Sequence, residues 1–326
     1  MTETKKKQEI TKLSLKDRKL LYELDKNSRQ TNSEIGKNIR MNKNTVNYKI
    51  KKFEQEQIIL SYYTVIDYSK LGYFNFRFYA KFFNTTTEKE QEIIDWLVKN
   101  PKAGVVARIE TVFDLAFMVW VKNPYEFEKF WFEFKEKFRP YFWNEKVDVF
   151  TSVYHFKRKY LINSQESTDY DFIGENKIIN HDELDLKILR ILSKNARIPL
   201  IEIAEKLKTP ERTIAFRIKK LEKNKIIQGY KANLNYGKLG YEYHKINIHL
   251  NKVPKRSELL EFANTQPNII YYDISNNDYD YEIDVEVKEK QGLLNLLAEL
   301  KEKFQVRDIE ILTFKKYYKL ELIPEV

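Results

Sequence analysis

Two segments of this chain place amide and basic side chains around an apolar helical stripe, at intervals that suit hydrogen bonding to a nucleic acid. The stripes are Val46, Ile50 and Phe53 in one segment and Ile214, Ile218 and Leu221 in the other. Asn can make two hydrogen bonds to adenine, Arg can make two to guanine, and Lys or Arg can neutralise phosphates. The residue types therefore favour noncovalent readout of double-stranded DNA. The candidate contact residues are Asn42, Lys43, Asn44, Thr45, Asn47, Tyr48, Lys49, Lys51 and Lys52 in the first segment, and Thr209, Glu211, Arg212, Thr213, Phe216, Arg217, Lys219 and Lys220 in the second.

The two segments differ in the side chains that would face the bases. Asn44 suits adenine, whereas Arg212 suits guanine and Glu211 could accept a hydrogen bond from cytosine. We therefore expect the two segments to read different sequences. The basic residues expected to hold phosphates are Lys49, Lys52, Arg217 and Lys220.

The distribution of charge favours this interpretation over a merely solvated helix face, which is what most charge runs are. The chain has 326 residues, 58 of them basic and 48 acidic, and a net charge of +10. Residues 1–60 hold 15 basic and 8 acidic groups, and residues 182–230 hold 12 and 7, so the two stretches carry +7 and +5. Positive charge is thus concentrated where DNA is expected. Lys5 to Lys7 fit either a phosphate-seeking arm or a disordered tail.

Other chemistries find little support in the composition. The chain has no Cys, which excludes disulfides, thiolate metal sites and Cys nucleophiles. Its four His residues are scattered, without metal-ligand spacing or a triad, so we expect no metal, no cofactor and no catalytic residue. No apolar run of about 18 residues and no secretory leader is evident, which favours the cytoplasm and argues against a membrane partner.

The elements that carry the two segments occur twice in the chain. An ungapped comparison of residues 17–73 with residues 185–241 gives roughly 22 identities in 57 positions, a level that chance seldom reaches. KNSR at residues 26–29 faces KNAR at residues 194–197, and KLGY closes both copies at residues 70–73 and 238–241. The apolar pattern still matches beyond this stretch when two residues are dropped from the second copy. A whole unit is therefore duplicated.

Three apolar stripes in succession predict three short helices at the start of each unit. We expect Asn42 to cap the third helix of the first unit, and Thr209 to cap that of the second, with Pro210 at the first helical position. Residues 58–67 and 226–235 mix β-branched and aromatic residues with polar ones and predict a short hairpin wing. Three helices and a wing make a winged helix-turn-helix, whose third helix enters the major groove of DNA.

The second half of each unit predicts strand, helix, strand, strand, helix, strand, the order of a ferredoxin-like domain. One apolar helix face recurs in both copies, formed by Phe127, Phe130, Trp131, Phe134 and Phe138 and by Leu293, Leu296, Leu297, Leu300 and Phe304. The expected fold class is α+β, with two tandem units that each join a winged helix-turn-helix to a ferredoxin-like βαββαβ domain. The expected boundaries are 1–68 and 69–162, a polar linker at 163–182, and then 183–236 and 237–326.

Several strings resemble the leucine-responsive regulator/asparagine-regulator (Lrp/AsnC) family of prokaryotic transcription factors. They are residues 17–29, 43–46, IKKFE at 50–54 and LGY at 71–73, with RIKKLE at 217–222 and IIQGY at 226–230 in the second copy. The resemblance spans nearly the whole chain, twice, whereas the usual member has one unit. It implies DNA binding by the helix-turn-helix, and dimerisation, often with amino-acid effector sensing, by the α+β domain.

The family's sensor domains typically carry a Gly three residues before an Asp, in a turn that contributes to the effector pocket. Asp114 and Asp280 match this Asp and are the effector-binding candidates, but Thr111 and Asn277 stand in place of the Gly. A residue with a side chain resists the positive φ of such a turn. This replacement argues against effector binding of the usual kind.

Charge on the α+β strands predicts how the two units pair. Arg77 and Lys81 lie on one strand face of the first copy, and Glu282, Asp284 and Glu286 form an acidic row in the second. Opposite charges favour contact between unlike copies, so we expect the α+β domains to form an internal pseudo-dimer. Exchange between chains to give higher oligomers is the alternative.

Two other functions fit part of the pattern. Sirohaem decarboxylases resemble the same arrangement, and some are fused pairs of units, but they rely on a His on the strand after the first α+β helix. Residues 103–109 (AGVVARI) and 269–274 (IIYYDI) have no His at the matching places, which argues against this enzyme. The other alternative is an architectural DNA-binding protein that needs no effector and has weak sequence preference.

Overall fold

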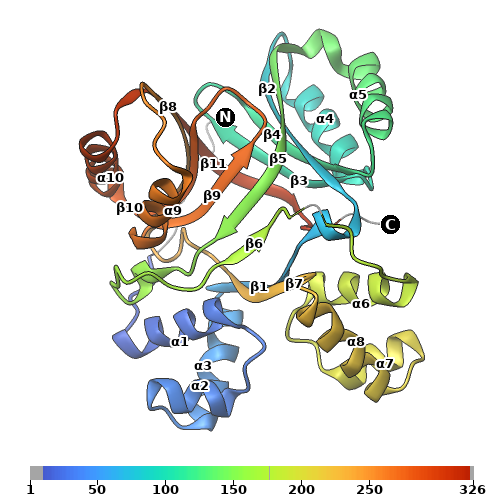
Figure 1. The fold of residues 1–326 in the computed structure, drawn as a ribbon, viewed down its shortest axis with the longest axis vertical. Helices are drawn as coiled ribbons and strands as arrows, with labels where there is room; N and C mark the ends of the chain where they lie inside the picture. Colours follow the sequence, from blue (N-terminus) through green and yellow to red (C-terminus); the bar gives the residue numbers. More distant parts are fainter. Residues whose placement is uncertain (1–9, 176, 324–326) are drawn as a thin grey trace.

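The computed structural model describes residues 10–175 and 177–323, so Lys5 to Lys7 lie outside the described residues. Two helix-turn-helix modules occupy one end of the molecule, in the lower part of Figure 1. The first consists of α1 (Leu15–Lys26), α2 (Asn32–Ile39), α3 (Lys43–Gln55) and β1 (Ile59–Ile66), and the second of α6 (Glu183–Lys194), α7 (Leu200–Leu207), α8 (Glu211–Lys223) and β7 (Ile227–Leu234). The predicted order of three helices is confirmed in both copies.

The third helices of the two modules begin differently. The Asn42 side chain accepts a hydrogen bond from the backbone N–H of Asn44 at 2.8 Å, as predicted. The predicted cap of α8 is wrong. The Thr209 hydroxyl donates to the carbonyl of Leu207 instead, and Pro210 occupies the N-cap position without a side-chain hydrogen bond. Because the hydroxyl faces back toward α7, it does not accept from the start of α8.

Neither module has the predicted hairpin wing. Residues 58–67 and 226–235 each contribute one strand, and β1 pairs antiparallel with β7 across the two modules, with Tyr62 opposite Ala232. The strands were predicted, but their partners were not, because residue alternation does not say which segment supplies the other half of a ladder. The buried side chains of both modules consequently belong to one hydrophobic core.

The other elements form two α+β domains with the predicted order. The first comprises β2 (Phe74–Phe82), α4 (Thr87–Lys99), β3 (Ala103–Glu110), β4 (Leu115–Val121), α5 (Pro124–Phe138) and β5 (Phe142–His155). The second comprises β8 (Tyr241–Leu250), α9 (Arg256–Thr265), β9 (Ile269–Ser275), β10 (Tyr281–Lys288), α10 (Glu289–Lys303) and β11 (Val306–Leu320). In each domain the strands lie in the spatial order fourth, first, third, second, which is the ferredoxin-like arrangement.

The two α+β domains pair with each other through their edge strands. β3 pairs antiparallel with β11, and β5 pairs antiparallel with β9. Because β2 also pairs with β5, the sheet closes into a barrel, which removes its exposed edges. Helices α4 and α5 cover one side of the barrel, and α9 and α10 cover the other (Figure 1).

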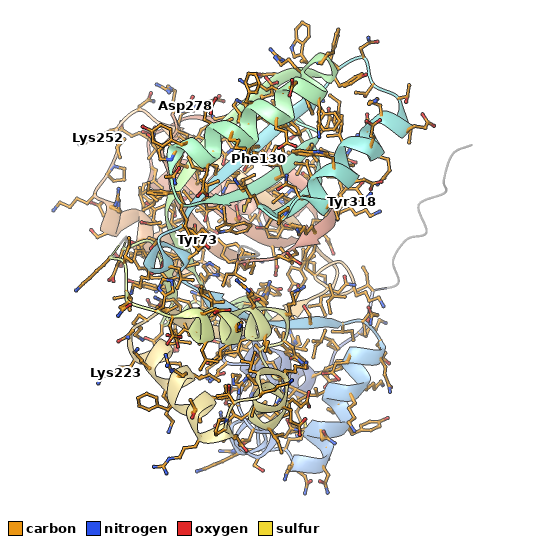
Figure 2. All side chains as sticks on the ribbon, turned by 90° about the vertical axis from the view of Figure 1, so that its right-hand side faces the viewer. Tyr73, Phe130, Lys223, Lys252, Asp278 and Tyr318 are labelled. Carbon is orange, nitrogen blue, oxygen red and sulfur yellow. The ribbon has the colours of Figure 1, made fainter. Side chains whose placement is uncertain are left out.

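Aromatic side chains pack the outer layer of the first α+β domain. Phe130, Phe134 and Phe138 of α5 are buried against the sheet, where the rings of Phe78 and Phe117 stack with 4.4 Å between their centroids. Figure 2 shows Phe130 beneath the α5 ribbon. The apolar helix face predicted from the sequence therefore belongs to the core.

Residues 156–182, which we call the strap, lead from the barrel to the second module. They include a 3-10 turn (Lys159–Leu161) and the short strand β6 (Asp171–Ile173), which pairs with β5. Phe156 and Tyr160 are buried, and the N–H of Ile179 donates to the carbonyl of Lys70. Two further 3-10 turns lie at Tyr68–Leu71 and Arg139–Tyr141. None of the helices within the described ranges is long and apolar enough to span a bilayer.

Candidate nucleic-acid interface

The exposed face of α3 carries predicted contact residues of the first module. The side chains that lie on this face are Lys43, Asn44, Thr45, Asn47, Tyr48, Lys51 and Lys52. Tyr48 is 66% exposed, which leaves its ring free to touch a base or a thymine methyl group. The Asn47 side chain accepts a hydrogen bond from Asn32 of α2 at 3.2 Å, which orients its amide. The helix thus presents amides, one aromatic ring and cations on a single surface.

The exposed face of α8 presents a different set at the matching positions. Glu211, Arg212, Lys219 and Lys220 are exposed, whereas Thr209, Thr213 and Arg217 are half-buried. Phe216 occupies the position that Tyr48 has in the first copy and is also 66% exposed. Lys223, at the C-terminal end of α8, lies on the surface at the same end of the molecule (Figure 2). The two helices therefore share an exposed ring and differ in their polar side chains.

Lys49 and Arg217, at matching positions, are held by ion pairs within their own modules. Lys49 Nζ lies 2.5 Å from Asp17, and Arg217 Nη1 lies 2.6 Å from Asp182 and 3.3 Å from Asp185. The backbone N–H of Asp185 and the Arg217 guanidinium lower the pKa of Asp182. These contacts hold α3 to α1 and α8 to α6. Both basic side chains consequently brace the third helices and are not free cations in this structure.

Reciprocal arginines, which we call the arginine clasp, join the two modules. Arg29 Nη1 donates to two carbonyls of the loop before α7, at 2.6 and 3.3 Å, and Arg197 Nη1 donates to two carbonyls of the loop before α2. Each guanidinium also lies over a tyrosine ring, at 5.4 Å for Tyr230 and 5.3 Å for Tyr62. The matching strings KNSR and KNAR were the only signal of this contact in the sequence. The clasp and the β1–β7 ladder fix the two third helices relative to each other.

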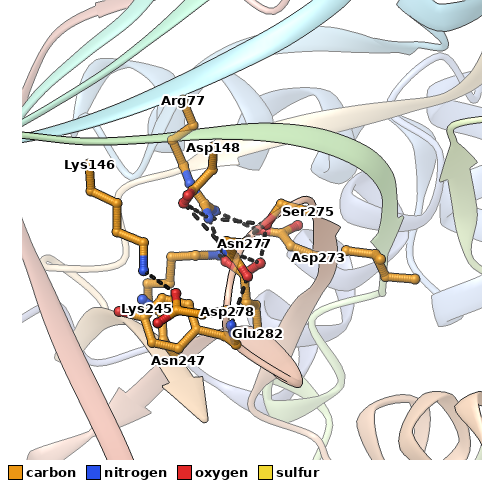
Figure 3. A network of polar contacts seen from close by, with 12 residues as sticks. Arg77, Lys146, Asp148, Lys245, Asn247, Asp273, Ser275, Asn277, Asp278 and Glu282 are labelled. Atoms are coloured by element: carbon orange, nitrogen blue, oxygen red, sulfur yellow. Dashed lines mark hydrogen bonds and ion pairs between the residues drawn. The ribbon is translucent and has the colours of Figure 1, made fainter. Parts of the chain in front are cut away.

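A network of buried charges lies inside the barrel. Arg77 Nη2 is 2.5 Å from Glu282, while Lys245 Nζ is 2.6 Å from Asp273 and 3.1 Å from Asp284. Figure 3 shows Arg77 and Asp148 of the first domain close to Lys245, Asp273 and Glu282 of the second. The Arg77–Glu282 pair joins unlike copies, as the charge pattern predicted. The acidic row predicted on a strand face is therefore an interior surface.

The carboxylates of this network differ in their affinity for protons. Burial raises the pKa of Asp273 to about 6. Although burial acts in the same direction on Glu282, the Arg77 and Lys245 charges lower its pKa to about 2. Lys81 does not join the network, because it pairs with Asp114 of its own domain at 3.1 Å. The prediction that Lys81 faces the acidic row is therefore wrong.

A second buried ionic chain ties the first module to the barrel. Arg158 of the strap donates to Asp25 of α1 at 2.6 Å and makes two hydrogen bonds of 2.9 Å to Glu286 of β10. Asp25 and Glu286 are fully buried. Ser193 occupies the position of Asp25 in the second copy, and its hydroxyl bonds to a carbonyl within its own helix. Sequence reasoning missed Arg158 because its partners are 133 and 128 residues away.

The two effector-binding candidates accept backbone hydrogen bonds at the ends of strands. Asp114 accepts a hydrogen bond from the N–H of Phe82 at 3.0 Å, and Asp280 accepts one from the N–H of Leu250 at 2.7 Å. Thr111 has a φ of 120°, so the turn keeps a positive φ even with a β-branched residue. The resistance expected of a side chain therefore does not keep Thr111 out of this conformation.

The histidines of the described chain are dispersed. No group of His, Asp and Glu within the described ranges is arranged to hold a metal ion. Burial holds the pKa of His155 well below its usual range, and a ring nitrogen of His244 lies 3.0 Å from the hydroxyl of Thr313.

Comparison with known proteins identifies relatives of both modules. A family of winged helix-turn-helix DNA-binding domains matches residues 13–59 and 181–228. An uncharacterised helix-turn-helix transcriptional regulator of Pyrococcus furiosus is 52% identical over 61 residues, which are 19% of this chain and 41% of that protein. The transcriptional regulator LrpB of Bacillus subtilis is 30% identical over 146 residues, 44% of this chain and 97% of that protein. The chain therefore matches about two fifths of the first relative's length and nearly all of the second's.

A solved structure resembles the chain over both units. The crystal structure of the siroheme decarboxylase NirDL superimposes with a TM-score of 0.62, covering 95% of this chain and 94% of that one. The sequence identity is 16%. At this identity the likeness concerns the fold, including the tandem arrangement of the two units.

Proposed function

The chain belongs to the leucine-responsive regulator/asparagine-regulator (Lrp/AsnC) family as a tandem duplication, and from this premise we propose that it is a sequence-specific transcriptional regulator that binds double-stranded DNA through both third helices. The observation that carries the proposal is that α3 and α8 belong to two modules held in one fixed arrangement. The two helices expose different polar side chains at matching positions, while the arginine clasp and the β1–β7 ladder hold their modules together. Such a pair suits two unlike half-sites about one helical turn apart.

Base contacts are assigned to the exposed N-terminal part of each helix. Asn44 would bind adenine through two hydrogen bonds, and Arg212 would bind guanine, each pair discriminating by about 1–3 kcal/mol against other bases. Tyr48 and Phe216 would lie against thymine methyl groups. The remaining assigned contacts are Asn42, Lys43, Thr45, Asn47, Thr209, Glu211 and Thr213.

Phosphate contacts are assigned to the basic side chains that follow. Lys51, Lys52, Lys219 and Lys220 are exposed, and of these only Lys52 has an ion pair within the described chain, a 3.7 Å contact with exposed Glu56. Lys49 and Arg217 would reach phosphate only by leaving their acidic partners. We therefore expect each of these two to act mainly by positioning its helix.

Selection from a random duplex pool tests the proposal. Purified full-length protein is incubated with the pool at two salt concentrations, and the bound fraction is sequenced. Asn44→Ala and Arg212→Ala are selected in parallel, with Lys187→Ala as the control because Lys187 is an exposed cation of α6 off the third helices. We expect an asymmetric bipartite motif in which each of the first two variants loses information in one half only.

Other outcomes would change the conclusion in defined ways. Salt-sensitive binding without a motif would indicate an architectural DNA-binding protein, because phosphate contacts alone carry no sequence information. Absence of binding at both salt concentrations would reject DNA binding.

A siroheme decarboxylase-like enzyme is the second candidate, favoured only by the fold likeness over the whole chain. β3 and β9, where the resemblance would place a catalytic His, contain none. The curated relatives compared above are regulators of transcription. A tetrapyrrole absorbance band that stays with the purified protein would favour the enzyme over the regulator.

A further inference from the structure

A cavity of about 400 Å³ lies between the strap and the second α+β domain. Its walls include the side chains or backbone of Tyr160, Asn163, Tyr241, Asn268, Lys288 and Gly292. The volume is in the range of small-molecule sites in proteins.

Two aromatic rings form one wall of the cavity. The centroids of Tyr160 and Tyr241 are 4.2 Å apart, and the rings are inclined at 33°. Tyr160 is 4% exposed and Tyr241 is half-buried, so the pair is fixed in place by its surroundings. A planar apolar group can pack against such a wall with little loss of side-chain entropy.

The lining at Lys288 and the start of α10 includes a cation, and Glu289 of the same first turn does not line the cavity. Lys288 is exposed, makes no ion pair within the described residues, and stands at the N-cap of the 15-residue helix α10, which no side chain caps. The free N–H groups of a first helical turn and a neighbouring ammonium group together attract a carboxylate. Burial raises the pKa of Tyr241; the Arg18 charge acts in the opposite direction and the Glu286 charge in the same direction, so charges of both signs act on this ring.

The cavity also adjoins the ionic chain that holds the first module. Tyr160 donates a hydrogen bond to Glu286, which binds Arg158, which in turn binds Asp25 of α1. The Asn268 side chain donates to the carbonyl of Glu286, and the N–H of Glu286 donates to the carbonyl of Asn268. A molecule that moves the Tyr160 ring would therefore act on the contact between the barrel and the first module.

We infer that this cavity binds a small organic acid with a planar apolar body, whose carboxylate lies at Lys288 and the start of α10 and whose ring packs on Tyr160 and Tyr241. Occupancy would alter the DNA affinity of the first module in preference to the second. The effect on DNA affinity rests on the proposed function, whereas ligand binding at this cavity does not.

Binding is tested on the full chain without DNA. Benzoate and phenylacetate at millimolar concentration are the probes, benzamide is the uncharged analogue, and saturation-transfer NMR gives the affinity. We expect benzoate to bind about tenfold more tightly than benzamide, and Lys288→Gln to remove most of this difference, because one charged hydrogen bond contributes on the order of a tenfold factor. Lys290→Gln changes an exposed cation of the same helical turn that does not line the cavity, and should have no effect.

Filling the cavity gives an independent test. A Cβ added at Gly292 would meet only Val287, at 3.7 Å, so Gly292→Ala is a tolerated control and Gly292→Phe places a ring in the cavity without a backbone clash. Gly292→Phe should abolish probe binding while its unfolding midpoint stays that of Gly292→Ala. No binding of either acid to the wild-type chain, or equal binding to Gly292→Phe, would overturn the inference.

The link to DNA is tested separately with Tyr160→Phe, which keeps the ring and removes the hydroxyl bonded to Glu286. Benzoate should change the wild-type affinity for the half-site read by α3 several-fold more than that for the half-site read by α8. Tyr160→Phe should still bind benzoate but lose this difference. Equal effects on both half-sites would reject the regulatory part and leave the binding site standing.

Discussion

The two copies of the repeat agree where their DNA-binding modules meet and differ where their α+β domains meet. Arg29 and Arg197 occupy matching positions and donate to matching loop carbonyls, and Arg197 also donates to the Asn32 side chain at 3.0 Å. Inside the barrel, Ala116, Met118 and Trp120 of β4 match Glu282, Asp284 and Glu286 of β10. Like residues thus support a pseudo-twofold arrangement of the modules, while unlike residues make the barrel contact specific for one copy of each kind.

This contrast explains why unlike α+β domains pair with each other. Two copies of the second domain would bring two acidic rows together in a buried space, where unpaired charges are costly. The observed pairing brings Arg77 of the first domain to Glu282, in addition to Lys245, which pairs with Asp284 inside the second domain.

Removing Arg77 should have the largest effect. Arg77→Met leaves the buried carboxylates of the network with Lys245 as their principal cation, so we expect the free energy of unfolding to fall by about 3–5 kcal/mol. Denaturant unfolding of the full chain measures the loss. Lys187→Met, which breaks an exposed pair with Glu183, is the control and should leave the unfolding midpoint unchanged. Equal midpoints for the two variants would show that the network does not stabilise the barrel.

The arginine clasp should respond symmetrically. Arg29→Ala and Arg197→Ala should each cost about 2 kcal/mol of unfolding free energy, because each removes hydrogen bonds from a charged donor to loop carbonyls. Lys37→Ala removes an exposed cation of α2 and serves as the control. Arg197 also donates to Asn32, so its loss should be slightly the larger; a loss confined to one variant would contradict the pseudo-twofold arrangement.

The raised pKa of Asp273 predicts a pH dependence. Its folded pKa of about 6 lies above the ordinary 3.8, so the folded state binds this proton more tightly than the unfolded state does. The resulting stabilisation is complete below pH 3.8 and is lost as the pH rises through 6. Relative to Asp273→Asn, the wild-type chain should gain about 1 kcal/mol of stability between about pH 7 and pH 5.

This comparison is made as a difference between the two proteins at each pH. The other titratable groups are present in both proteins, so their contributions largely cancel in the difference. A difference in unfolding free energy that stays constant across the window would refute the raised pKa.

The smallest effect is expected at two matched turn positions. Thr111 has a positive φ, which Gly adopts without strain. Thr111→Gly also removes the hydrogen bond from the Thr111 hydroxyl to Ile311. The net result should be a stabilisation of about 0.5 kcal/mol. The Asn277 side chain instead donates to Ser275 at 3.0 Å and to Glu282 at 2.9 Å. Asn277→Gly should therefore destabilise the chain, and thermal unfolding of both variants would show whether the signs are opposite.

The sequence by itself determined the elements and the surface chemistry of this protein. Apolar spacing located the three helices of each module and the βαββαβ order, because a buried helix face or strand face must recur with the period of its own backbone. The exposed side chains of α3 and α8 could be predicted for the same reason, because helix residues outside the buried stripe face solvent. The repeat identified the matching positions.

Only the tertiary structure determines which segments far apart in the sequence contact each other. β1 found its ladder in β7 rather than in a local hairpin, and Arg158 bridges Asp25 and Glu286 across two units. Local patterns fix which residues can be buried, but they do not say which distant segment will supply the second half of a ladder or the counter-charge. That choice depends on closing the barrel and desolvating all of its charges at once, which is a property of the assembled fold.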